Sequence, residues 1–134
     1  MIDVAGAVVL PGFVDSHAHI QELGRKEVQV DLVGVGSEEE AIQRVAEYAT
    51  DIAPGEWIVG WGWDEGAWAA DYPDNTELSL VSMDNPVYLG GLHGFASWVN
   101  KKALETAGID TDTQNPENGE IIKNVETGQP TGIL

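Results

Sequence analysis

Near the start of the chain, three side chains with metal-binding or acid–base chemistry alternate with small residues: Asp15, His17 and His19. They follow the apolar, β-branched run of residues 8–14, which predicts a buried strand. Alternate side chains of an extended chain point to the same face, so these three groups would share one face. A neutral imidazole is the commonest protein ligand of divalent metals, and the spacing therefore predicts a metal-binding pair, His17 and His19. The alternative is a histidine pair without metal, at a strand end or on the surface.

The elements that must position this pair follow it in the chain. Residues 37–53 are predicted to form a helix, with Ser37 as N-cap, Glu40 completing a capping box and Pro54 ending it. Residues 56–63 and 87–90 are predicted strands, and residues 97–107 a helix ended by Gly108. The segments 119–124 and 130–134 are predicted to pair as a hairpin.

An aromatic row runs along the strand predicted over residues 56–63. Alternation places Trp57, Val59, Trp61 and Trp63 on one face. Such a row forms either part of the core or the wall of a substrate site, and core packing is favoured. Further on, Asn100 is expected on the surface of the helix predicted over residues 97–107.

The composition is strongly acidic, with 23 Asp and Glu against 6 Lys and Arg and a formal net charge of −17. Nucleic acids and anionic membranes bind positive surfaces, so neither is expected as a partner. The absence of cysteine excludes a disulfide scaffold, a thiol nucleophile and thiolate metal ligands. The sequence contains neither an apolar run of about 18 residues nor a signal-peptide pattern, and a cytoplasmic location is expected.

Four motifs together resemble one protein family. The first, LPGFVDSHAH at residues 10–19, resembles the first barrel strand of the amidohydrolase superfamily. Three more narrow the resemblance to amidohydrolase family 3, the YtcJ-like metal-dependent hydrolases: WIVGWGWD at 57–64, GFASWVNKKAL at 94–104 and GQPTGIL at 128–134. Their order along the chain makes the resemblance far more specific than the histidine pair alone.

The resemblance implies an α/β fold, a partial (β/α)8 TIM barrel that carries the first barrel strand and an α/β excursion. A full barrel takes about 250 residues, whereas this chain has 134. Residues 1–7 would be the remnant of a small β-domain, and residues 8–134 an incomplete barrel domain. Because the first strand is apolar on both faces and would lack neighbours, the chain is expected to form a homo-oligomer or a swapped dimer.

The activity implied by the resemblance is hydrolysis of an amide, cyclic amide or ester of a small-molecule substrate by a metal-activated water. The metal would be divalent, with zinc expected. The family's remaining ligands and general base lie on later strands, so no catalytic residue is assigned here and the chain alone is expected to be inactive. Some relatives are named as regulators of exoenzyme production, so a regulatory or binding protein without turnover is the alternative.

The resemblance also assigns further site residues. Asp15 would support the two metal-binding histidines without itself binding the ion. His93 follows the strand predicted over residues 87–90, and Asp64 and Trp63 lie at the end of the preceding strand, so all three are expected on the substrate side. For His93 the alternative is a capping or packing role, and for Asp64 it is a solvated acidic turn.

Overall fold

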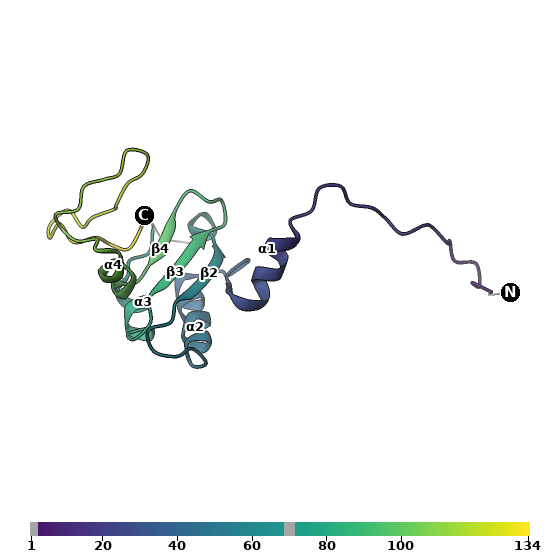
Figure 1. Cartoon of the computed structure of the whole chain (residues 1–134), viewed down its shortest axis with the longest axis horizontal. Helices are drawn as coiled ribbons and strands as arrows, with labels where there is room; N and C mark the ends of the chain where they lie inside the picture. Colours follow the sequence, from purple (N-terminus) through teal and green to yellow (C-terminus); the bar gives the residue numbers. More distant parts are fainter. Residues whose placement is uncertain (1–2, 69–71) are drawn as a thin grey trace.

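The computed structural model describes residues 3–68 and 72–134 and has a mixed α/β architecture (Figure 1). A four-stranded sheet has the order β1-β2-β3-β4; β1, β2 and β3 are parallel, and β4 is antiparallel to β3. The strands are β1 (Val30–Asp31), β2 (Ile58–Trp63), β3 (Val87–Gly91) and β4 (Ser97–Val99). The helices are α1 (Ile20–Arg25), α2 (Glu38–Ala49), α3 (Thr76–Val81) and α4 (Lys101–Ala107), with 3-10 turns η1 (Lys26–Val28) and η2 (Glu65–Ala67).

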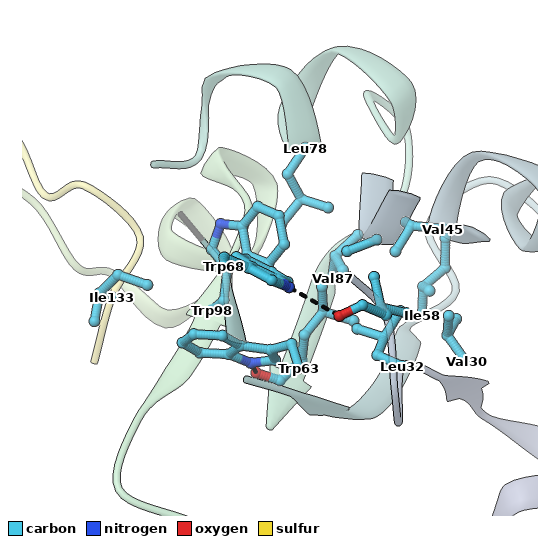
Figure 2. Packing of buried hydrophobic residues seen from close by; sticks show 13 residues of the cluster. Val30, Leu32, Val45, Ile58, Trp63, Trp68, Leu78, Val87, Trp98 and Ile133 are labelled. Atoms are coloured by element: carbon cyan, nitrogen blue, oxygen red, sulfur yellow. Dashed lines mark hydrogen bonds between the residues drawn. The ribbon is translucent and has the colours of Figure 1, made fainter. Parts of the chain in front are cut away.

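Helices α2 and α3 connect the three parallel strands and pack on one face of the sheet. Val45 of α2 and Leu78 of α3 are fully buried with the sheet residues Ile58, Val87 and Leu89. In Figure 2 the indoles of this cluster gather at one side, and the aliphatic side chains around Val45 lie at the other. The opposite face of the sheet keeps aromatic side chains exposed, Tyr88 by 42%. A parallel sheet is usually covered on both faces. This sheet differs, because one face is packed against helices and the other is open.

Helix α2 confirms the predicted start and ends earlier than predicted. The Ser37 side chain accepts a hydrogen bond from the backbone N–H of Glu40, and Glu40 Oε2 accepts one from the backbone N–H of Gly36. That N–H and Arg44 lower the pKa of Glu40, because both stabilise its charged form. The helix ends at Ala49 instead of residue 53.

The predicted strand at residues 8–14 is not a strand in this structure. These residues run away from the sheet in an extended path (Figure 1), with Val8 82% and Phe13 93% exposed. An apolar strand becomes buried only where neighbours pair with it. At the outer edge of the sheet near β1, side chains of α2 occupy backbone carbonyls that a further strand would pair with. Arg44 donates to the Asp31 carbonyl at 2.8 Å, and the Tyr48 hydroxyl donates to the Val28 carbonyl at 2.9 Å.

The predicted aromatic row is split by an irregularity in β2. The pairing with β3 shifts register between Trp61 and Trp63, at Gly62, whose φ is +104°. Trp61 keeps the open face and is 41% exposed, whereas Trp63 turns into the core and is fully buried. A Cβ at Gly62 would lie 2.5 Å from Val33 Cγ2. Only glycine therefore fits the bulge that sends the two indoles to opposite faces.

The helix predicted over residues 97–107 is a strand followed by a helix. Residues 97–99 form β4, and α4 begins only at Lys101, with Asn100 as its N-cap. The Ser-Trp-Val sequence suits a strand, and cross-strand pairing with β3 decides its conformation. The predicted end is confirmed, because Gly108 is the C-cap with a left-handed φ of 70°.

Asn100 is fully buried, which corrects the expectation that it lies on a helix surface. Its Oδ1 accepts hydrogen bonds from the backbone N–H groups of Val87 (3.0 Å) and Ala103 (2.8 Å). Its Nδ2 donates to the Asn85 carbonyl (2.8 Å) and to Ser82 Oγ (2.9 Å). One amide thus joins the end of α3, the entry to β3 and the start of α4.

The pairing predicted near the C-terminus is confirmed. The Ile122 N–H donates to the Ile133 carbonyl at 3.0 Å, and an isolated bridge joins Lys123 to Pro130. The last residues also continue the sheet beyond β4, because Leu134 exchanges backbone hydrogen bonds with Ser97. Among the described residues, no helix is long and apolar enough to cross a membrane.

Replacing Asn100 with alanine should lower the free energy of unfolding by about 2–4 kcal/mol. The change removes a helix cap and leaves buried backbone donors and acceptors without partners. Urea unfolding followed by circular dichroism measures the loss. The matched control is Asn118→Ala, an exposed loop asparagine, with an expected effect within about 0.5 kcal/mol. Equal stabilities for the two variants would contradict the role given to Asn100.

Candidate functional site

His17 and His19 lie in the exposed segment that leads into α1. The centroids of their rings are 5.4 Å apart, and the ring planes are inclined by 58°. Asp15 Oδ1 accepts a hydrogen bond of 2.9 Å from the backbone N–H of His17, which forms an Asx turn. The chain then bends at residues 16–17, so a turn, and not a straight strand, brings the two imidazoles together.

The spacing of the two rings suits two ligands of a single metal ion. With Zn–N bonds of about 2.0–2.1 Å and tetrahedral geometry, two imidazole centroids lie about 5 Å apart, close to the 5.4 Å found here. A catalytic zinc usually takes three protein ligands and a water. Among the side chains that the structure describes, which do not include those of Glu22 and Glu65, no group of three or more His, Cys, Asp or Glu could hold an ion. Among the described side chains, the pair thus offers two imidazole donors to an ion, and no third ligand joins them.

A second pair of predicted residues meets at the carboxyl ends of β2 and β3. Asp64 follows β2 and His93 follows β3; the two strands are adjacent and parallel, so their ends lie side by side. The imidazole Nε2 of His93 is 3.8 Å from Asp64 Oδ2, and the second oxygen, Oδ1, accepts from the Gly66 N–H at 3.0 Å. The His93 side chain is 60% exposed and that of Asp64 27%. The carboxylate is thus fixed by the backbone, and the imidazole beside it is open to a ligand.

Trp63 lies behind these two residues and not beside them. Its indole is fully buried, its Nε1 donates to the Leu89 carbonyl at 2.8 Å, and its ring packs 6.1 Å from that of Trp98. The Trp63 carbonyl also accepts from the Leu92 N–H at 2.8 Å, which holds the loop that carries His93. In this structure Trp63 supports the strand ends from the core.

A groove of about 590 Å³ lies between α1 and the open face of the sheet. Trp61 and Tyr88 line it from the sheet, and Arg25 and Lys26 line it from α1 and η1, together with His19. Sequence reasoning did not select the two aromatic residues or the two basic residues as site residues. The available signal was the alternation of β2 and β3, which puts Trp61 and Tyr88 on the same face of adjacent strands.

Comparison of the chain with known proteins identifies the same family that the four sequence motifs resemble. The model of the amidohydrolase family matches residues 1–134. The chain belongs to the amidohydrolase family. This confirms the relationship predicted from the four sequence motifs.

Among individual relatives, the chain is similar to the putative amidohydrolase YtcJ of Bacillus subtilis, with 37% identity over 134 residues. It is 30% identical to an N-substituted formamide deformylase of Arthrobacter pascens over 137 residues. These matches cover 99% and 100% of this chain, which spans about a quarter of the length of both relatives (25% of each). A solved structure of an uncharacterized metal-dependent hydrolase from Pyrococcus horikoshii superposes with a TM-score of 0.57 and 31% identity, covering 92% of this chain and 22% of that one.

The 134-residue chain should bind zinc weakly, with a dissociation constant of about 10 µM or weaker. Two imidazoles supply only part of the protein ligands that a zinc site needs, so the ion keeps most of its water. Calorimetric titration at neutral pH measures the affinity of the wild type, of His17→Ala and of the control His93→Ala. Submicromolar binding that is lost in His17→Ala and kept in His93→Ala would show a complete site and contradict this prediction.

Proposed function

We propose that this amidohydrolase chain is part of a metal-dependent hydrolase that cleaves an amide, cyclic amide or ester bond of a small molecule. The observation that carries the proposal is the imidazole pair, His17 and His19, whose 5.4 Å ring separation suits one metal ion within a chain that the family matches from end to end. The named relatives support the same chemistry, because one is a deformylase of N-substituted formamides and a structural neighbour is a metal-dependent hydrolase.

The sheet supports a partial (β/α)8 barrel as the setting of this site. Strands β1, β2 and β3 are parallel, are connected through α2 and α3, and have these helices on one face, as in a barrel wall. The antiparallel β4 departs from that pattern, as expected of an excursion from the barrel. In this proposal the ligands beyond the two histidines come from the part of the relatives' length that this chain does not span.

A divalent metal, with zinc favoured by the imidazole donors, would lower the pKa of a bound water toward about 7 and make a nucleophile available at neutral pH. His17 and His19 would hold the ion, with Asp15 fixing the turn that brings their rings together. Asp64 would orient His93, whose exposed imidazole would form hydrogen bonds to polar groups of the substrate. Trp63 would keep both strand ends in place from the core.

In the complete protein, His17→Ala and His19→Ala should each abolish turnover and lower the metal content, while the melting temperature changes little. Barrel enzymes carry their functional groups at the carboxyl ends of the strands, apart from the residues that stabilise the fold, so removing one ring changes the ligand set and not the core. Metal analysis, turnover of formamides and cyclic amides, and a melting curve are the measurements. His93→Ala is the matched control: it should keep the metal and raise KM by about tenfold, a loss of about 1.4 kcal/mol.

Full metal content and full turnover in His17→Ala would contradict the hydrolase proposal for this motif. A complete wild-type protein that binds metal and a small molecule but turns over none of the amides, cyclic amides or esters tested would favour the regulatory alternative instead.

We also infer that the 134-residue chain self-associates through residues 8–14. Val8, Phe13 and Val14 are at least 82% exposed, and burying apolar surface yields about 25 cal/mol per Å². Because the net charge of −17 opposes association, light scattering is best done at moderate salt, where this repulsion is screened. Dimers or larger species are expected, and the double variant Val9→Asp, Phe13→Asp should be monomeric. A wild type that stays monomeric under these conditions would contradict the inference.

A further inference from the structure

The groove beside α1 is lined by a cation, Arg25, that no described side chain neutralises. Two of the chain's six basic residues, Arg25 and Lys26, line the groove, and Asp31 is the acidic residue among its described lining side chains. Lys26 Nζ lies 3.6 Å from Asp31 Oδ2 and 5.9 Å from the centroid of the Trp61 ring. The carboxylate of Asp31 thus neutralises the charge of Lys26. Among the described side chains, no carboxylate lies within ion-pair distance of Arg25. In a chain of net charge −17, the described side chains thus leave Arg25 as a positive charge at this groove.

The wall opposite Arg25 is apolar and held in place. Val59, Trp61 and Tyr88 lie on the open face of adjacent strands, and Val59 is paired in register with Tyr88. The Trp61 ring lies across Gly90, since a Cβ there would be 3.1 Å from Trp61 Cδ1. The Tyr88 hydroxyl accepts a hydrogen bond of 2.8 Å from Ser97 Oγ. A glycine and a hydroxyl contact therefore hold two aromatic side chains on the same face of the sheet.

The size and position of the groove suit a small ligand near the histidine pair. Its volume of about 590 Å³ lies within the range of about 300–1,000 Å³ that is usual for small-molecule sites. His19 lines the same groove as Arg25 and Trp61. A ligand in the groove would therefore lie within reach of the cation, the aromatic wall and one of the imidazoles.

We propose that this groove binds a small molecule with a carboxylate on an apolar body, the carboxylate on Arg25 and the body on Trp61 and Tyr88. A guanidinium pairs with a carboxylate through two parallel hydrogen bonds, which makes arginine selective for planar acids. The inference rests on the proposed function and deepens it: the substrate is an acid whose hydrolysable bond lies toward His19. The acidity of the rest of the chain repels anions, so binding of such a ligand depends on Arg25.

The test uses 4-phenylbutyrate as the probe and its neutral analogue 4-phenylbutyramide, both titrated into the chain by calorimetry in the presence of EDTA. The acid should bind about tenfold more tightly than the amide. Arg25→Gln should remove this preference and leave binding of the amide unchanged, and that retained binding also reports an intact groove. Trp61→Leu should weaken both ligands. The matched control is Lys102→Gln, which removes an exposed charge on α4 outside the groove and should change neither affinity.

Equal affinities of the wild type for acid and amide would overturn the proposal, as would a preference for the acid that survives in Arg25→Gln. Inorganic phosphate that displaces 4-phenylbutyrate at equal concentration would also overturn it, because the site would then select an anion without an apolar body. The titrations need no metal and no turnover, so their failure is distinguishable from that of the proposed function. Conversely, a complete protein inactivated by His17→Ala but lacking any preference for acids would keep the hydrolase and lose only this assignment.

Discussion

The bulge at Gly62 is the constraint on which both faces of the sheet depend. At this residue the pairing of β2 with β3 shifts, and the chain takes a φ of +104° that favours glycine. The shift directs Trp63 into the core, against Trp68 and Trp98 (Figure 2). Trp61 remains on the open face of the sheet. It also sets where β2 ends, and therefore where Asp64 meets His93. One backbone irregularity thus builds the core and places a pair of site residues.

On the packed side of the molecule, hydrogen bonds of buried polar side chains fix the arrangement of the elements together with apolar packing. Asn100 joins α3, β3 and α4 through four hydrogen bonds of 3.0 Å or shorter, and Trp98 Nε1 donates to the Asp74 carbonyl at 2.9 Å. No buried side-chain nitrogen or oxygen of the described residues lacks a hydrogen-bond partner. Because a buried polar group without a partner costs free energy, these contacts favour one arrangement of the short elements over its competitors.

The open side of the sheet carries the groups that can meet a ligand. The parallel strands bring Asp64 and His93 together at their carboxyl ends, which is where parallel α/β proteins usually bind ligands. The same strands place Trp61 and Tyr88 across from the basic residues of α1 and η1. The histidine pair belongs to neither strand end, because an Asx turn and a bend ahead of α1 bring its rings together. The Asp64–His93 pair, the groove beside α1 and the histidine pair thus place polar and aromatic groups around one sheet.

The sequence by itself determined the family, the cap of α2, the left-handed end at Gly108 and the pairing near the C-terminus. These features rest on local chemistry: a serine oxygen three residues before an amide, a glycine at a helix end, and turn residues between two short segments. The closeness of Asp64 and His93 could also be predicted from the sequence, because both follow predicted strands.

Only the tertiary structure decided the rest. Residues 8–14 are exposed because burial needs neighbouring strands, which local sequence does not encode. Residues 97–99 became a strand through pairing with β3, and Asn100 became a buried link because three elements converge on it. Trp61 and Trp63 face opposite sides because Gly62 is an extra residue in the pairing of β2 with β3, and the close approach of Val33, 29 positions earlier, leaves room only for glycine there.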